Sequence, residues 1–217
     1  MDALIDSIGF GIMQLLGFTL LAVITIVLIW AKRVVSRLVQ SHFVVEEIQN
    51  DQKITELLVE VRLAAKADRV CIYLFHNGEH YISGSSILRI SGAYETVAFG
   101  ISMQRLSAQS ILISTVPEAV SFLVNPDAQE AVAVANVEDL APGFYRSALE
   151  LQGVRATAKY PLYKSSDVVG FICADYVQQL PPSDADIDIL KRHAPKLEMY
   201  LHHTKKASWW KRVLGAV

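Results

Sequence analysis

The chain has 217 residues, of which 52% are hydrophobic, and it carries 20 basic and 22 acidic side chains. This length accommodates one domain of ordinary size together with an attached segment. A mean hydropathy of +0.32 excludes a disordered chain. The 2 cysteines form no CxxC pair, which excludes a disulfide scaffold and a four-thiolate zinc or iron–sulfur site.

The first predicted element is a membrane-spanning helix. The 25 residues from Ser7 to Ala31 contain no charged side chain and are mainly Ile, Leu, Val and Phe. About 20 apolar residues span the hydrocarbon core of a bilayer as a helix. A cleaved signal peptide would begin with basic residues and end at a small-x-small site, whereas this segment follows Asp2 and Asp6 and ends at Lys32. We therefore expect an uncleaved transmembrane segment in residues 1–31.

Basic residues flank this segment on its C-terminal side, at Lys32, Arg33 and Arg37, and none flank its N-terminal side. The positive-inside rule then places the N-terminus outside and the main domain in the cytoplasm. We expect a single-pass protein of the cytoplasmic (inner) membrane, with the lipid bilayer as a partner. Trp30 occupies the position of an interfacial aromatic residue.

Residues 32–50 form the next predicted element, a juxtamembrane helix. Val34, Leu38, Val45 and Ile48 place apolar side chains on one helical stripe. Such a stripe is typical of a helix that pairs with its copy in a second chain, so we expect a homo-oligomer. The continuation of the helix, over residues 54–65, is expected to pack on its own domain.

Residues 51–204 are predicted to form the main domain. A β-branched and aromatic run at residues 70–75 predicts a strand that is stopped by an Asn77-Gly78 turn, and residues 86–96 predict a second strand. Pro117 opens a short helix in an otherwise irregular middle segment. The remaining expected elements are a strand at 132–136, a helix at 142–151, strands at 154–162 and 168–176, and a closing helix after 183.

The closing helix begins with the capping box Ser183-Asp184-Ala185-Asp186 and contains Pro195, which predicts a kink. Because neighbouring strands are joined by short turns, the sheet is expected to be antiparallel, which gives an α+β fold. The first and last helices of the domain would cover one face of the sheet. The irregular middle would cover the other face and enclose a small pocket.

The order of elements resembles the GAF domain, a small-molecule sensor module. The resemblance rests on the strand at 70–75, on Gly153-Val154-Arg155 leading into Tyr160-Pro161-Leu162, on residues 169–176, and on the helix after Pro181-Pro182-Ser183. It implies a GAF/PAS-like antiparallel sheet flanked by helices, preceded by the transmembrane helix. The Asn, Lys, Phe, Asp-Glu signature of cyclic-nucleotide-binding GAF domains, the chromophore cysteine of bilin-binding ones and the three cysteines of the methionine sulfoxide reductase are not found.

The architecture also resembles single-span phage holins, in which one transmembrane helix precedes a globular GAF- or PAS-like domain. Segments such as Phe75-His76-Asn77-Gly78 and Gly84-Ser85-Ser86 resemble uncharacterised phage proteins. The charge pattern differs from that of the holin family, because the globular domain of a holin lies outside the cytoplasmic membrane.

The GAF-like arrangement implies that the end of the first strand, the second strand and the middle segment face the ligand. Arg89 and Glu95 are separated by an even number of residues and are expected to share one face of the second strand. They are either ligand contacts or a solvated ion pair of little energetic value. The expected pocket residues are His76, Asn77, Tyr81, Ser85, Ser86, Arg89, Tyr94, Glu95 and Tyr145.

No residue pattern predicts catalysis, and we expect no cofactor and no metal. His76-Asn77-Gly78-Glu79-His80 matches the H-x-x-E-H string of zinc peptidases. That chemistry needs both histidines on one helix face, whereas here a strand precedes the motif and Asn-Gly interrupts it. Cys71 and Cys173 fall on strands that are neighbours in GAF sheets, where they are either buried thiols or a pair close enough to bridge on oxidation.

The tail, residues 205–217, has an interfacial composition, because basic side chains flank a Trp-Trp pair; the alternative is a disordered tail. The segment from 44 to 204 carries 13 basic and 20 acidic residues, so we expect no nucleic-acid partner. The expected membrane-interface residues are Trp30, Lys32, Arg33, Arg37, Lys205, Lys206, Trp209, Trp210, Lys211 and Arg212.

Together these patterns predict a non-enzymatic, membrane-anchored regulatory module that binds a small molecule or a regulator protein. The alternative is a holin-type protein that forms membrane lesions, whose globular domain binds a regulator.

Overall fold

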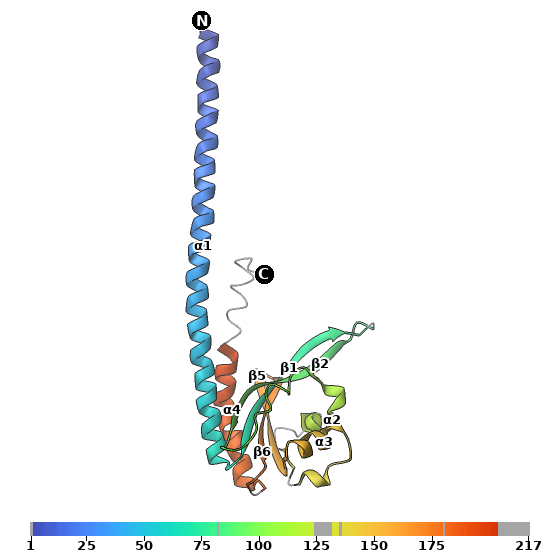
Figure 1. The fold of residues 1–217 in the computed structure, drawn as a ribbon. Helices are drawn as coiled ribbons and strands as arrows, with labels where there is room; N and C mark the ends of the chain where they lie inside the picture. The colour runs from blue at the N-terminus through green and yellow to red at the C-terminus, as the bar shows by residue number, and fades with distance from the viewer. Residues whose placement is uncertain (1, 82, 124–131, 135, 180, 204–217) are drawn as a thin grey trace. The chain divides into compact units, whose positions relative to one another are not determined.

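The computed structural model describes residues 2–81, 83–123, 132–134, 136–179 and 181–203 (Figure 1). The chain divides into two compact units, the first within residues 1–48 and the second formed by residues 49–206. The predicted interfacial tail, residues 205–217, lies outside the described residues.

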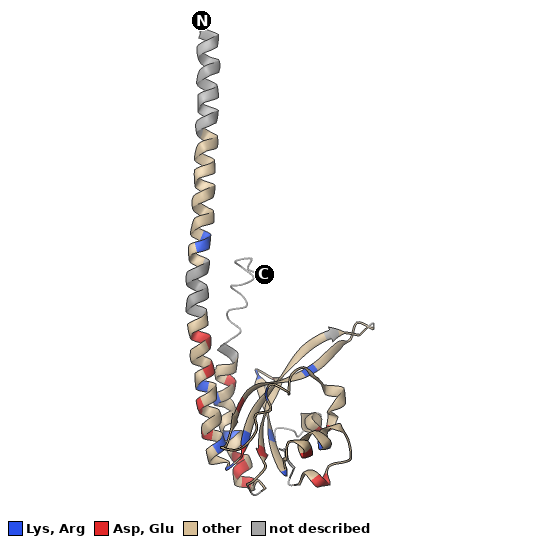
Figure 2. Cartoon of the chain, in the orientation of Figure 1, with Lys and Arg blue, Asp and Glu red and all other residues tan. Residues whose placement is uncertain are grey.

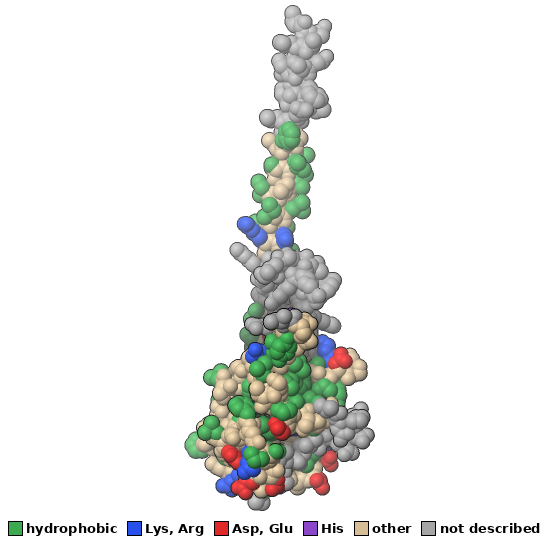
Figure 3. All heavy atoms as spheres, turned by 90° about the vertical axis from the view of Figure 1, so that its right-hand side faces the viewer, with side chains coloured by type: hydrophobic (Ala, Val, Ile, Leu, Met, Phe, Trp, Pro, Cys, Tyr) green, Lys and Arg blue, Asp and Glu red, His purple; other side chains and the backbone are tan. Residues whose placement is uncertain are grey.

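The first unit consists of the N-terminal part of α1 (Asp2–Ala64), a single helix that continues through Asn50 and Asp51 into the second unit. Residues Gly17–Val35 have a mean hydropathy of 2.1, and they are long and apolar enough to cross a membrane by length and composition. Their apolar side chains are exposed along the helix, with Trp30 66% exposed, and basic side chains follow at the end of the stretch (Figures 2 and 3).

The second unit is built on a six-stranded sheet in the order β3-β2-β1-β6-β5-β4. Every neighbouring pair is antiparallel, so the predicted α+β class is confirmed. The strands are β1 (Arg69–His80), β2 (Ser86–Val97), β3 (Ile111–Leu112), β4 (Val132–Val134), β5 (Ala156–Lys164) and β6 (Asp167–Tyr176).

One face of this sheet is covered by the C-terminal end of α1 and by α4 (Asp184–His203) (Figure 1). The strands alternate with a period of two, so that Ile172, Ala174 and Tyr176 of β6 point to this face. They pack there against fully buried residues of both helices. The capping box is formed as predicted, because Ser183 N donates to Asp186 Oδ2 at 2.9 Å, and Pro195 lies within the helix.

The other face is covered by shorter elements, α2 (Pro117–Val120) and α3 (Phe144–Leu151), together with the connection from β2 to α2. A core cluster joins Ile90, Val116, Ala119, Val120, Phe122, Phe171 and Cys173 on this side. α3 ends just before Gly153, whose φ of +70° is readily adopted by glycine. The irregular middle therefore occupies the face opposite the long helices, as the sequence predicts.

The predicted turn at Asn77-Gly78 is wrong. β1 continues through both residues to His80, and the chain reverses beyond the end of that strand, where Tyr81 N donates to Ser85 O at 2.9 Å. The pairing of Asn77 with Leu88 keeps the strand extended. Asn-Gly is a turn signal only where the strands on both sides have ended, and here cross-strand pairing continues past it.

The prediction that Arg89 and Glu95 share a face of β2 is also wrong. The pairing register shifts between Ile72 and Tyr73, whose partners are Tyr94 and Gly92. This β-bulge adds one residue to β2 and reverses its alternation. Glu95 therefore pairs with Cys71 and lies on the α2–α3 face, whereas Arg89 pairs with His76 on the opposite face.

Candidate functional site

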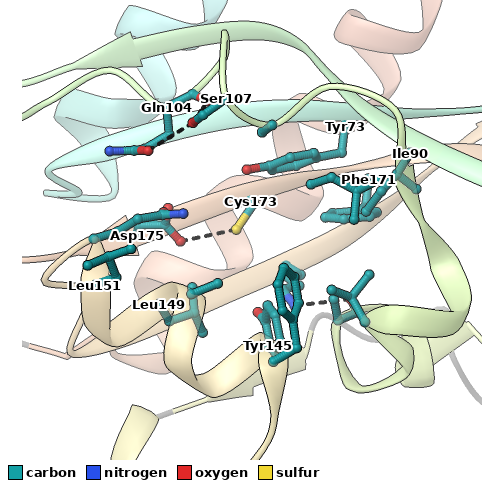
Figure 4. Close-up of a pocket in the computed structure, with 18 residues that line it drawn as sticks. Tyr73, Ile90, Gln104, Ser107, Tyr145, Leu149, Leu151, Phe171, Cys173 and Asp175 are labelled. Carbon is teal, nitrogen blue, oxygen red and sulfur yellow. Dashed lines mark hydrogen bonds between the residues drawn. The ribbon is translucent and has the colours of Figure 1, made fainter.

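A cavity of about 500 Å³ lies between the sheet and the segments that cover its second face (Figure 4). Its floor is formed by Tyr73 of β1, Lys159 of β5 and alternate residues of β6, and its opposite wall by α3. The lining is mainly apolar, with a few polar groups, which is the composition of a small-molecule site. The lining residues are Tyr73, Ile90, Gln104, Ser107, Ala108, Ile111, Val116, Ala119, Phe144, Tyr145, Ala148, Leu149, Leu151, Gln152, Lys159, Phe171, Cys173 and Asp175.

An aromatic cluster forms one part of the floor. The rings of Tyr73 and Phe171 stack with centroids 5.1 Å apart, and the ring of Phe122 meets that of Phe171 edge-on at 5.8 Å. These are favourable arrangements for aromatic quadrupoles. The cavity thus presents a packed aromatic surface to any molecule inside it.

A buried charge network closes one end of the cavity. Arg69 is 1% exposed, and its Nε donates to Asp175 Oδ2 at 2.9 Å while its Nη2 donates to Gln152 Oε1 at 2.8 Å. Burial lowers the pKa of Arg69, but the Asp175 carboxylate outweighs this and leaves the pKa raised. The guanidinium therefore stays charged and joins β1, β6 and the residue after α3.

Glu95 extends this network to the connection between β2 and β3. Its two carboxylate oxygens accept hydrogen bonds from Gln104 N and Arg105 N, both at 2.8 Å, and Oε1 lies 4.0 Å from Arg69 Nε. Arg69 Nη1 also donates to Ser102 O at 3.3 Å. The charged cluster thus fixes the segment that carries Gln104 and Ser107 against the sheet, at the cavity edge seen in Figure 4.

Lys159 is the second buried cation, and it is 5% exposed. Its Nζ donates to Ala119 O at 3.0 Å, and it lies 4.3 Å from the centroid of the Tyr145 ring and 5.8 Å from that of Phe171. Cation–π attraction offsets part of the cost of removing the ammonium group from water. Burial lowers the pKa of Lys159 below the ordinary value of a lysine.

The two cysteines occupy directly opposed positions on β1 and β6, and both are buried free thiols. Cys173 Sγ lies 3.1 Å from Thr157 Oγ1 and 3.2 Å from Asp175 Oδ1, whereas Cys71 Sγ lies 3.6 Å from Glu95 Oε1. Burial raises the pKa of both thiols. They are therefore protonated at neutral pH and poor nucleophiles.

Of the pocket residues expected from sequence, Tyr145 lines this cavity. Glu95 lies at its closed end but is bonded to backbone N–H groups, and Tyr94 points to the other face, where its hydroxyl donates to Asp51. The other residues lie on the β1–β2 hairpin away from the cavity: His76 (2.9 Å from Ser91 Oγ), Asn77, Tyr81, Ser85, Ser86 and Arg89 (bonded to Ser110 O).

The sequence analysis missed Tyr73, Lys159, Phe171, Cys173 and Asp175 as site residues. Two of them could have been found from the sequence, because Lys159 and Asp175 are charged residues in the interior of strands that consist mainly of apolar residues. A charged side chain in such a position is buried and needs a partner. In the part of the chain that the structure describes, no group of three or more His, Cys, Asp or Glu side chains is arranged to hold a metal ion.

The GAF domain family model matches residues 50–201. The chain belongs to the GAF domain family. A search of curated proteins found no match.

Solved GAF structures have the same fold at low identity. The blue-light-absorbing form of the PixJ GAF domain from Thermosynechococcus elongatus is 18% identical, with a TM-score of 0.54 over 79% of this chain and 94% of that one. The GAF domain/HD domain protein from Geobacter sulfurreducens is 15% identical, with a TM-score of 0.54 over 72% and 94%. A far-red-absorbing protein with bound biliverdin IXa is 16% identical, with a TM-score of 0.50 over 73% and 97%.

The buried network makes a prediction about stability. Replacing Arg69 by Met leaves Asp175 and Glu95 buried without their cation, and removal of one partner of a buried pair costs about 3–5 kcal/mol. For a domain of this size we expect the melting temperature to fall by roughly 6–20 °C, measured by calorimetry on the full chain in detergent micelles.

The matched control is Lys53→Met, which breaks the exposed pair between Lys53 and Glu56 at 3.6 Å. Exposed pairs contribute at most about 1 kcal/mol, so this variant should melt close to the wild type. Equal melting temperatures for the two variants would show that the Arg69 network does not stabilise the domain.

Proposed function

We propose that this GAF protein is a membrane-anchored regulatory module that binds a small molecule in the cavity beneath α3. The main support for this proposal is the cavity itself, because it combines a stacked aromatic floor with a few polar groups. We propose no catalytic step, since the cavity thiol of Cys173 is protonated and the carboxylate of Asp175 is engaged by Arg69. A structural neighbour solved with biliverdin IXa bound supports a small molecule as the occupant.

Membrane anchoring is the second part of the proposal. It is supported by the length and composition of Gly17–Val35 and by the basic residues Lys32 and Arg33 near the C-terminal end of that stretch. Arg37 lies further along α1, and the basic tail with Lys205, Lys206, Trp209, Trp210, Lys211 and Arg212 would supply additional contacts with anionic lipid. The positive-inside rule places the GAF domain in the cytoplasm in this proposal.

Pairing of α1 with the same helix of a second copy is the third part. Val44, Val45 and Ile48 are 51%, 54% and 52% exposed in the single chain, although they are apolar. Burying such a stripe against its copy removes the apolar surface from water. A paired helix that is continuous with the domain would connect cavity occupancy to the oligomer.

Ligand binding is tested by comparing native and denaturing mass spectra of the full chain, purified in detergent without added ligand. We expect a mass excess in the native spectrum alone. Ala148→Trp fills part of the cavity from α3 and should remove the excess, whereas Ala141→Trp, at an exposed position before α3, should keep it. A bare mass for the wild type, in protein from its own host, would contradict the proposal.

Orientation is tested by adding protease to intact spheroplasts. We expect the GAF domain to be protected until the membrane is disrupted, because the basic residues after the span keep that side in the cytoplasm. Digestion of the domain in intact spheroplasts would contradict this orientation and favour the holin-type arrangement.

Pairing is tested by the substitution Ile48→Lys, which places a charge on the proposed interface. We expect the mass of the detergent-solubilised protein, measured by light scattering, to fall from that of an oligomer to that of a monomer. Asn50→Lys adds the same charge two residues further along, on the opposite side of the helix, and should leave the oligomer intact. Equal behaviour of the two variants would argue against this stripe as the interface.

A further inference from the structure

Lys159 is the one charged lining residue whose charge the described part of the domain does not neutralise. Asp175 also lines the cavity, but it is paired with Arg69 at 2.9 Å. Among the described residues, none of the ion pairs within 4.0 Å includes Lys159. Buried charges in proteins are normally paired, so an unpaired one in a cavity indicates a missing partner.

The geometry around Lys159 leaves donors for that partner. An ammonium group has three N–H bonds, and the structure gives one acceptor for them, Ala119 O at 3.0 Å. The ammonium group lies over the ring faces of Tyr145 and Phe171, 4.3 Å and 5.8 Å from their centroids. The remaining N–H groups lie in a cavity that also holds the aromatic floor.

We propose that the cavity binds an organic monoanion, a carboxylate on a compact aromatic or apolar body, and that Lys159 Nζ donates hydrogen bonds to its carboxylate. This inference rests on the proposed ligand-binding function and specifies the chemistry of the ligand. The carboxylate completes the ion pair at Lys159, and the apolar body lies against Tyr73 and Phe171.

The charge of the cavity favours a monoanion over a phosphate group. A dianion would need a second cation, and the nearby guanidinium of Arg69 already binds Asp175, Gln152 and Ser102. A second negative charge would therefore remain uncompensated in a buried site beside Asp175, which is energetically costly. A neutral ligand can accept a hydrogen bond from the ammonium group, but it leaves the buried charge without a counter-ion.

Binding of this kind is linked to proton uptake. Burial lowers the pKa of Lys159 in the free protein, and a bound carboxylate raises it again. Between these two pKa values binding takes up a proton. While the ligand carboxylate is ionised, its affinity is therefore constant below the lower pKa of Lys159 and falls as the pH rises from the lower to the upper one.

The other groups that face Lys159 do not produce this proton uptake. On β6, the pKa of Cys173 is raised, chiefly by burial, and Asp175 is paired with Arg69. The pKa values of Tyr73 on β1 and Tyr145 on α3 are raised as well, also chiefly by burial, and Glu118 on α2 is exposed. Lys159 is therefore the group that accepts the proton.

The test uses the full chain in detergent micelles and two matched probe pairs, 2-naphthoate with 2-naphthamide and biphenyl-4-carboxylate with its amide. Calorimetric titration should show at least one acid bound tenfold or more tightly than its amide. Titrations in two buffers of different ionisation enthalpy, at a pH above the free-state pKa of Lys159, should show proton uptake for the acid and none for the amide.

The variant Lys159→Met should remove the preference for the acid, and Lys191→Met, at an exposed position on α4, should retain it. None of the ion pairs among the described residues includes Lys159, so Lys159→Met does not leave a counter-ion buried without its cation. If Lys159→Met does not fold, the ratio of acid to amide affinity and the proton uptake of the wild type test the monoanion proposal instead.

The outcomes separate this inference from the proposed function. Equal binding of acids and amides, no binding of any acid, or an unchanged preference in a folded Lys159→Met overturns the monoanion proposal. Ligand binding itself stands as long as the native mass spectrum retains its excess. Loss of both would overturn the two proposals together.

Discussion

The strands at the centre of the sheet are covered on both faces, and this constraint determines both the core and the site. β6 shows it most directly, because Ile172, Ala174 and Tyr176 pack against α1 and α4 while Phe171, Cys173 and Asp175 face the cavity. A strand that is buried on both sides gives its polar side chains no water. Each of them must therefore find a partner inside the protein or in a ligand.

The Arg69 cluster satisfies this requirement internally. Asp175, Glu95 and Gln152 come from three separate segments of the chain, and one guanidinium holds or faces all of them. Glu95 also accepts hydrogen bonds from the backbone N–H groups of Gln104 and Arg105. The charged residues that compensate one another within the sheet therefore also position a wall of the cavity. The requirement for a partner is met only in part at Lys159. This side chain is therefore the one that indicates a ligand.

The sequence predicts the fold well because the fold depends on local patterns. Strand alternation, the capping box at Ser183 and the glycine after α3 each act within a few residues, and the structure has them all. The site depends on pairing across the sheet. The bulge opposite Ile72 and Tyr73 reverses the alternation of β2, so no count along that strand alone could place Arg89 and Glu95 correctly. The continuation of β1 through Asn77 likewise depends on its partner strand.

The sheet has the cavity on one face and the C-terminal end of α1 on the other. Tyr73 of β1 lines the cavity, and its neighbour Ile72 packs in the core cluster with Ile54, Leu58 and Val61 of α1. A ligand changes an equilibrium only by binding two states with different affinity. Any effect of a ligand on α1 would therefore pass through the sheet, because β1, β5 and β6 line the cavity on one face and pack in that core cluster on the other. Because Ile72 is closely packed against Ile54, Leu58 and Val61, displacing β1 alone would be costly, and the adjoining end of α1 would move with the strand.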